Sequence, residues 1–301
     1  MSATSINLFF AERNWSGLVI ADAASQNAKV LSAPRERLTE LLSREELARS
    51  GVYVLVGPSS SSSFGLEGYI GESDELGQRL RRHAKQKQFW NRAYVAVAKD
   101  SWFSKSHIRF LEAKLVEQAK QAPLITKVVN DKQNLEYERL SDGDRANLED
   151  YVAFLKLIMP ALGCPLYAFP ELSAPPTGRQ ILGGENVHFE MRKGGAVAMA
   201  YERDGSFYVT RGSTARVEEK LSLREGYRVS RRELMTRGLL VSDPSRNLLL
   251  FTQDVPFNSP SDAAAVVGTT SLNGRIEWKV LGTKTTYDEW QRMQSSSPTS
   301  R

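Results

Sequence analysis

Apolar residues alternate with polar ones in some segments and recur at helical spacing in others, which separates predicted strands from predicted helices. In the first 160 residues, short apolar runs predict strands at 6–10, 17–21, 28–31, 51–57, 68–71 and 89–98. Helical spacing predicts helices at 34–50, 73–83, 106–120 and 144–159. This mixture of elements indicates an α/β (α+β) protein, with a small sheet flanked by helices.

A proline- and glycine-rich stretch divides the chain. Residues 163–184 hold four prolines and four glycines, the composition of a linker. Beyond it, strands are predicted at 187–191, 196–201 and 205–210, followed by two helical pieces, a hairpin ending at 248–252 and a short helix at 259–267. We expect five parts: an N-terminal extension packing on the next domain (1–50), a first domain (51–160), a linker (161–185), a second small α+β domain (186–290) and a disordered tail (291–301).

The strands at 51–57 and 68–71 are predicted to form a hairpin. Pro58 and the five serines at 59–63 lie between them, and this composition predicts a mobile connection. The helix after the hairpin has Ser73 or Asp74 as its candidate capping residue.

Polar residues fall on the apolar faces of the two helices after the hairpin. At about 100° per residue, Glu112 lies about 40° from Ile108 and about 60° from Leu115 around the helix, and Arg79 and His83 lie among leucines. Burying such groups without partners is unfavourable, so their presence predicts a polar site enclosed by the two helices and the hairpin.

From Gly51 to Asn130, about 80 residues, the sequence resembles the GIY-YIG nuclease family. Gly51-Val52-Tyr53 matches the first triplet with valine for isoleucine, and Tyr69-Ile70-Gly71 matches the second. The family's arginine, histidine and helical glutamate are matched in order by Arg79, His83 and Glu112. For the asparagine that follows the glutamate's helix, Asn130 is our choice and Asn134 its competitor.

The resemblance implies a catalytic role for each of these residues. Glu112 would bind the metal, Arg79 would stabilise the phosphate, and Tyr69 or Tyr53, assisted by His83, would activate water. The residue types agree with that chemistry, because phosphodiester hydrolysis needs charge neutralisation, a proton acceptor and usually a divalent metal. A single carboxylate with retained water is a common way to hold Mg²⁺, so Mg²⁺ (or Mn²⁺) is the expected cofactor.

Other readings of the same residues remain open. The two tyrosines are also typical strand-packing aromatics, His83 could complement a helix dipole, and Glu112 could pair with Arg79 without a metal. Four further residues are candidates for substrate contact: Arg82, Lys105, His107 and Trp90. Trp90 could stack on a splayed base or pack in the core.

Positive charge is concentrated around the candidate site. Residues 77–120 contain eleven Lys or Arg and three acids, so this segment carries +8, against +5 for the whole chain. Such an excess favours a polyanionic substrate, although an ordinary solvated helix face has the same composition. We expect nucleic acid, and DNA in particular, as the partner.

Composition narrows the classes of protein to which the chain can belong. No apolar run approaches the roughly 20 residues of a membrane span, and no secretory signal opens the chain, so we expect a cytoplasmic protein without a membrane partner. The single cysteine, Cys164, excludes an intrachain disulfide and a cysteine-based zinc site.

The second domain resembles an uncharacterised domain, DUF4357, that is found fused to such nucleases. The resemblance rests on Asp254-Val255-Pro256-Phe257, on 259–265 and on Trp278-Lys279. Between Arg216 and Arg237, seven basic residues stand against four acids, which permits nucleic-acid contact. The expected function is a metal-dependent endonuclease, and the alternative is a non-catalytic or partner-regulated nucleic-acid-binding module on the same scaffold.

Overall fold

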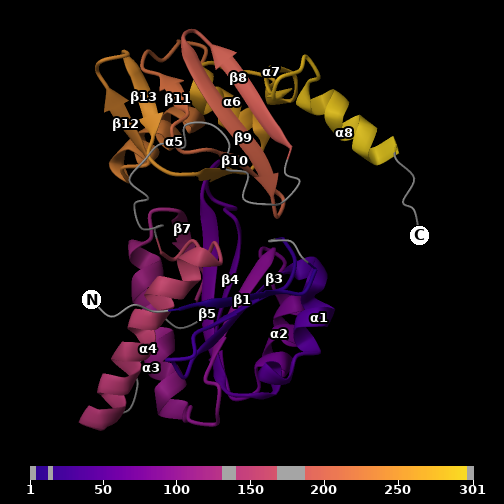
Figure 1. The fold of residues 1–301 in the computed structure, drawn as a ribbon. Helices are drawn as coiled ribbons and strands as arrows, with labels where there is room; N and C mark the ends of the chain where they lie inside the picture. Colours follow the sequence, from indigo (N-terminus) through magenta and orange to yellow (C-terminus); the bar gives the residue numbers. More distant parts are fainter. Residues whose placement is uncertain (1–4, 13–15, 131–139, 168–186, 297–301) are drawn as a thin grey trace. The chain divides into compact units, whose positions relative to one another are not determined.

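A computed structural model describes residues 5–12, 16–130, 140–167 and 187–296. The chain divides into two compact units (Figure 1). The first unit comprises residues 1–57 and 66–184, and the second comprises residues 58–65 and 185–301. Both units mix helices with sheets, so the predicted α+β class is confirmed.

The described part of the first unit is built on a seven-stranded sheet with the order β1-β2-β3-β6-β4-β5-β7. Its strands are β1 (Asn7–Phe10), β2 (Val19–Asp22), β3 (Lys29–Pro34), β4 (Gly51–Pro58), β5 (Leu66–Ser73), β6 (Arg92–Val97) and β7 (Ile125–Val128). Strand β3 pairs antiparallel with β6 along six residue pairs. The first 50 residues therefore contribute three strands to this sheet, where we had expected an extension lying against it.

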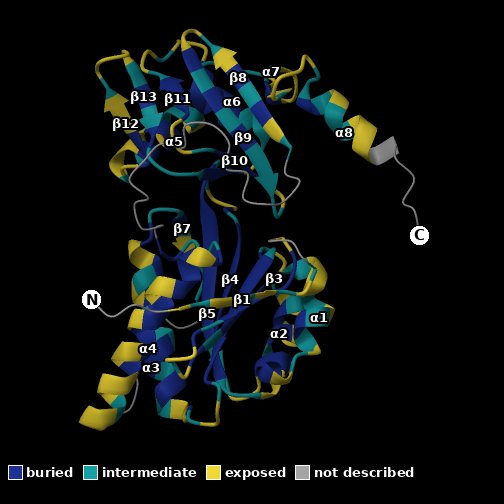
Figure 2. Cartoon of the chain, viewed as in Figure 1, coloured by how far each residue is buried: buried dark blue, intermediate teal, exposed yellow. Residues whose placement is uncertain are grey.

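Helices cover both faces of this sheet. They are α1 (Leu38–Leu42), α2 (Leu76–Gln86), α3 (Lys105–Gln121) and α4 (Asp142–Ala161), with 3-10 turns η1 (Arg35–Arg37) and η2 (Glu45–Ala48). Alternate residues of β4 enter two separate cores: Val52 and Val54 pack with α3 and α4, whereas Tyr53 and Leu55 pack with α1 and α2. Figure 2 shows β4 as a continuously buried strand between the two helical layers.

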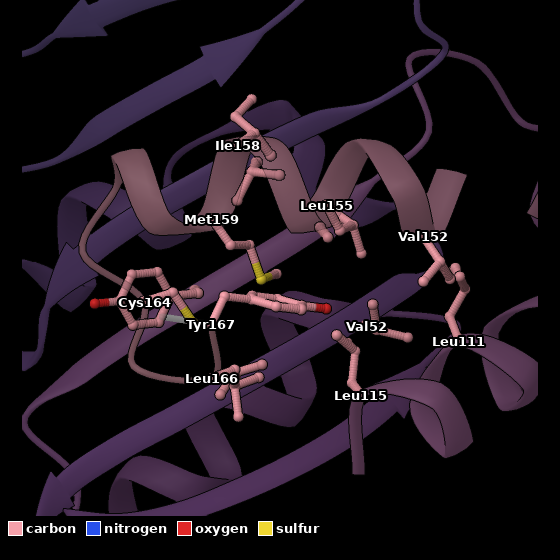
Figure 3. Close-up of a cluster of buried hydrophobic side chains, with 14 of the residues drawn as sticks. Val52, Leu111, Leu115, Val152, Leu155, Ile158, Met159, Cys164, Leu166 and Tyr167 are labelled. Atoms are coloured by element: carbon pink, nitrogen blue, oxygen red, sulfur yellow. The ribbon is translucent and has the colours of Figure 1, made fainter. Parts of the chain in front are cut away.

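The core on the α4 side continues past the end of that helix. Figure 3 shows Leu155, Ile158 and Met159 packed with Cys164, Leu166 and Tyr167. The predicted linker at 161–185 is therefore wrong for residues 162–167, which fold back onto the sheet. Residues 168–186 lie outside the described part of the chain.

Local geometry corrects two helix boundaries. The helix predicted at 34–50 is broken into η1, α1 and η2, because Arg44 is extended (ψ 138°) and Pro34 ends β3. Helix α2 begins after Glu75, and no side chain caps it. The hydroxyl of Ser73 accepts a hydrogen bond from the Glu75 backbone N–H, so the expected cap forms a small turn.

The second unit contains a five-stranded and a three-stranded sheet. Strands β14, β10, β9, β8 and β15 follow in that order, and β11, β13 and β12 form the other sheet. Their bounds are β8 (His188–Lys193), β9 (Ala196–Arg203), β10 (Ser206–Val209), β11 (Thr214–Arg216), β12 (Leu240–Asp243), β13 (Leu248–Phe251), β14 (Val255–Phe257) and β15 (Lys279–Val280).

The helices of the second unit are α5 (Glu225–Thr236), α6 (Pro260–Gly268), α7 (Gly274–Glu277) and α8 (Tyr287–Ser296). Helix α8 corrects the predicted disordered tail up to residue 296. Its first residue, Tyr287, is anchored in a cluster of rings with Phe189 and Phe207. Throughout the described residues, none of the helices has the length and apolarity needed to cross a membrane.

The 3-10 turn η2, which contacts α2, contains a buried carboxylate whose contribution to stability can be measured. Glu46 of η2 is fully buried; burial raises its pKa, but hydrogen bonds from Lys29 and Arg44 outweigh this effect and lower the pKa from 4.5 to about 2. Because the folded pKa lies below the unfolded one, Glu46 stabilises the fold above pH 4.5, and this contribution disappears as the pH falls toward 2.

We expect Glu46→Gln to lower the free energy of unfolding by about 2 to 3 kcal/mol at neutral pH. The difference from wild type should shrink on acidification, as measured by urea titrations across this range. The neighbouring Glu45→Gln, whose side chain is 75% exposed, is the control. A pH-independent difference would contradict the assignment.

Candidate active site

The predicted tyrosine, histidine and arginine meet on the α2 face of the sheet. The hydroxyl of Tyr53 lies 2.7 Å from His83 Nε2 and accepts a hydrogen bond from Arg79 Nε at 3.2 Å. Arg79 and His83 are four residues apart on α2, which places both side chains on the helix face that covers β4. Tyr53 has no exposed surface and His83 is 2% exposed.

Tyr69 of the neighbouring strand β5 completes this cluster. Its ring stacks 6.2 Å from the Tyr53 ring and lies 4.9 Å from the His83 ring, measured between centroids. The ammonium of Lys87, just past the end of α2, lies 4.4 Å from the centre of the Tyr69 ring. Two tyrosines from adjacent strands thus pack around one imidazole, with cations beside them.

Burial controls the ionisation of the cluster. Removal from water raises the pKa of Tyr53 far above its usual value, and the neighbouring Tyr69 raises it further, whereas Arg79 lowers it. Burial lowers the pKa of the Arg79 guanidinium, but the interactions with Tyr53 and Tyr69 together outweigh this effect, so the pKa is raised. At neutral pH Tyr53 is therefore a neutral phenol and Arg79 a cation.

Asn130 holds the strand that carries Tyr69. Its side-chain amide donates to the Ile70 carbonyl at 2.9 Å and accepts from the Ile70 N–H at 3.1 Å. Strand β7 has ended at Val128, so Asn130 takes over its pairing with β5. This arrangement gives Asn130 a positioning role next to Tyr69. Its competitor, Asn134, lies outside the described residues.

A surface pocket of about 510 Å³ lies beside the cluster, at the end of β5. Its lining contains four cations, from α2 and α3 (Arg79, Arg82, Lys105 and Arg109), and Ser73 with three acids (Glu72, Asp74 and Glu75). Helices α2 and α3 cover opposite faces of the sheet. Strand β7 pairs only with the first residues of β5, so the rest of β5 forms an open sheet edge that side chains from both helices reach.

Lys105 is neutralised within this pocket. Its ammonium lies 2.7 Å from a carboxylate oxygen of Glu72 and 2.8 Å from one of Asp74. Burial lowers the Lys105 pKa, but the two carboxylates outweigh this effect and raise it, so the ion pairs are maintained at neutral pH. The arginines are then the cations best able to receive a phosphate.

Glu112 lies on α3, seven residues after Lys105 and three after Arg109, so it shares a helix side with two residues of the pocket lining, but it does not itself line the pocket. Its flanking residues Leu111 and Leu115 are fully buried, whereas Glu112 itself is only half-buried. The prediction of an inward-facing carboxylate therefore overstated its burial. Glu112 lies at the margin of the core, where water reaches it.

The described residues contain no group of three or more His, Cys, Asp or Glu side chains able to form a metal-binding cage. Glu72 and Asp74 are occupied by Lys105. Mg²⁺ is also commonly held by one carboxylate combined with water and substrate phosphate. Glu112 has the required residue type and exposure.

Two predicted substrate contacts belong to the scaffold. Trp90 is 1% exposed and its ring is covered by the guanidinium of Arg35 at 4.7 Å, so it packs in the core and is not available to stack on a base. His107 forms the capping box of α3 with Ser104, and its ring contacts the Trp102 carbonyl at 3.2 Å. Neither residue lines the pocket.

Comparison with known proteins identifies the C-terminal part of the chain. Residues 187–291 match the family described as a domain of unknown function, DUF4357. The predicted resemblance of the second domain is thus confirmed. No curated protein and no solved structure matches the chain. The DUF4357 match begins after the candidate site, so the nuclease resemblance of residues 51–130 stays a prediction.

Sequence reasoning missed two groups that the structure places at the site. Arg109 lines the pocket one turn after Lys105, a spacing that could have identified it. Glu72 and Asp74 directly follow the second triplet, but nothing in their spacing indicates that Lys105, more than 30 residues away, binds both.

Gly71 tests the packing around Tyr53. A Cβ atom on Gly71 would overlap the Tyr53 hydroxyl and ring, whereas a Cβ on Gly68 of the same strand would lie 3.6 Å from Ile125, an ordinary contact. We expect Gly71→Ala to destabilise the protein by about 1 to 3 kcal/mol, because Tyr53 must move from His83. Gly68→Ala, the control, should change stability by less than about 0.5 kcal/mol. Equal unfolding midpoints in urea for the two variants would exclude this close packing.

Proposed function

We propose that residues 51–130 form a metal-dependent endonuclease site that hydrolyses phosphodiester bonds of nucleic acid, with DNA as the expected substrate. The observation that carries this proposal is the hydrogen-bonded contact of Tyr53, His83 and Arg79 beside a pocket lined by further cations. The proposal combines a proton carrier with phosphate-binding groups, as phosphodiester hydrolysis requires.

Arg79 connects the buried cluster to the pocket. Its Nε atom donates a hydrogen bond to Tyr53, and Arg79 is also one of the residues that line the pocket. A planar guanidinium can bind two phosphate oxygens and neutralise the charge that develops during attack. Arg82 and Arg109 would bind neighbouring phosphates, which makes substrate binding dependent on salt.

The tyrosines and His83 would move the proton. Because the Tyr53 phenol is neutral at pH 7, it cannot act as a preformed phenolate base. It can, however, accept a proton from water through Tyr69, while it donates its own proton to His83 Nε2 at 2.7 Å. The phenol then never carries a full charge in a buried site, which agrees with its raised pKa.

Glu112 would hold Mg²⁺ or Mn²⁺ together with water. The ion, when bound, supplies Lewis-acid polarisation of the phosphate and lowers the pKa of a bound water.

Cleavage of labelled single-stranded and duplex DNA, with Mg²⁺, Mn²⁺ or EDTA, tests the proposal. We expect metal-dependent cutting by the wild type and a loss of at least about 100-fold in Glu112→Gln, which keeps the side-chain size and removes the charge. Glu117→Gln, an exposed position on the same helix, should cut like the wild type. Binding of DNA without any cutting would favour the non-catalytic binding module instead.

Substitutions at Arg79 and at its neighbour Arg81 distinguish a catalytic role of the Arg79 guanidinium from a contribution of positive charge alone. Both variants, Arg79→Ala and Arg81→Ala, lose one cation from α2, but Arg81 is exposed and does not line the pocket. We expect Arg79→Ala to lower kcat by about 100-fold or more, whereas Arg81→Ala should change only the salt dependence of binding. Equal effects on kcat would show that Arg79 acts only through overall charge.

A further inference from the structure

The serine-rich loop between β4 and β5 belongs to the second compact unit. Residues 58–65 group with residues 185–301, although the strands on either side of the loop lie in the first unit. The expected mobile connection is therefore wrong. The second unit thus contains, besides the DUF4357 domain at residues 187–291, an eight-residue segment that precedes this domain by more than 120 positions.

Main-chain hydrogen bonds add this loop to the edge of a sheet. Strand β14 is the outermost strand of the five-stranded sheet. The Gly65 N–H donates to the Pro256 carbonyl at 2.8 Å, the Asn258 N–H donates to the Ser63 carbonyl at 3.1 Å, and Phe64 pairs antiparallel with Phe257. The loop thus satisfies backbone groups that an edge strand would otherwise leave open.

Side chains of the DUF4357 domain hold the loop at three further points. The amide of Asn258 donates to the carbonyls of Ser59 and Ser62, at 2.9 and 2.7 Å. The hydroxyl of Ser63 lies 2.7 Å from the hydroxyl of Ser230 on α5. Asn258 therefore binds the loop through both its side chain and its backbone.

One aromatic side chain anchors the loop in the core of the domain. Phe64 has no exposed surface, and its ring centroid lies 6.4 Å from that of Phe257. The Phe257 ring in turn lies 6.4 Å from the ring of Phe251 on β13, and both are fully buried. The turn out of the loop uses Gly65 with φ 82°, a conformation that favours glycine.

We propose that the DUF4357 domain is a clamp whose binding partner is the β4–β5 loop of the same chain, and that it orders the two strands bearing the tyrosines. Gly57, at the loop's start, is four residues after Tyr53, and Leu66, at its end, is three residues before Tyr69. Fixing both ends of the loop restricts the motion of both strands. The effect on catalysis rests on the proposed nuclease function.

A nucleic-acid-binding role for α5 has less support. Of the basic residues predicted there, Arg228 and Arg231 pair with Glu219, Arg232 with Glu225, and Arg237 with Glu233. Arg231 is 2% exposed and also donates to the Val266 and Arg216 carbonyls, so it stabilises the domain. Four of the seven basic residues in this run are therefore paired with carboxylates of the domain itself.

Hydrogen exchange of the full-length protein tests the clamp without any need for activity. Asn258→Asp removes both amide donors at nearly constant volume, and Phe64→Ala removes the anchor. We expect exchange in residues 58–66 to accelerate at least about tenfold, with smaller increases at the adjoining ends of β4 and β5. Phe9→Ala, which truncates a 58% exposed phenylalanine, is the control.

Wild-type exchange in the loop as fast as in an unstructured peptide would overturn the clamp. So would unchanged loop exchange in the variants while β9 stays protected. If Phe64→Ala fails to fold, Ser63→Ala, which removes only the contact with Ser230, replaces it with the same expected direction.

Cleavage rates separate the clamp from the proposed function. With DNA as substrate, we expect Asn258→Asp to lower kcat about tenfold with little change in KM. Suppose that the wild type cuts DNA and that Asn258→Asp exchanges faster in the loop but keeps the wild-type kcat. This result would overturn the ordering of the tyrosine strands and leave the nuclease proposal intact. If the wild type never cuts, the nuclease proposal fails, and exchange at the ends of β4 and β5 still decides whether the clamp orders them.

Discussion

The hydroxyl of Tyr53 is the point on which the arrangement of the first unit depends. A phenol with no exposed surface needs hydrogen-bond partners inside the protein, and here they are His83 and Arg79, one helical turn apart on α2. The strand beside it must leave room, which Gly71 provides by having no side chain. One buried polar atom thus couples β4, β5 and α2, so that small errors in the position of any of them would leave it unsatisfied.

The pocket arises because β5 has an incomplete neighbour. Strand β7 pairs with β5 only from Leu66 to Gly68, and Asn130 then bonds Ile70 through its side chain. Beyond that point the edge is open, so helices from opposite faces contribute side chains to one surface. The acids there are as important as the cations, because Glu72 and Asp74 neutralise Lys105 and leave the arginines to determine how a polyanion binds.

Sequence reasoning could predict the parts of the site that follow from spacing along one element. Arg79 and His83 lie on one helix face because they are four residues apart, and the two tyrosines lie in apolar runs that predict strands. It could not predict the partners of Lys105, since ion pairs across 31 and 33 residues depend on how separate elements pack. Trp90 was ambiguous for a related reason: a tryptophan beside arginines looks the same in sequence whether its ring is covered or free.

For the loop at 58–65, composition predicted a mobile connection, and the contacts of the loop show why this prediction was wrong. Serines are typical of mobile connections because their side chains bury little apolar surface, but this loop is held mainly by groups that composition does not register. Its carbonyls accept from Asn258, its glycine N–H donates to Pro256, and a single phenylalanine supplies the buried contact. Removing the DUF4357 domain at the linker would therefore expose Phe64 and free both ends of the tyrosine hairpin. A truncated first unit would then differ from the whole protein in two respects at once, the missing domain and an unheld loop, whereas a point substitution at Asn258 changes only how the loop is held.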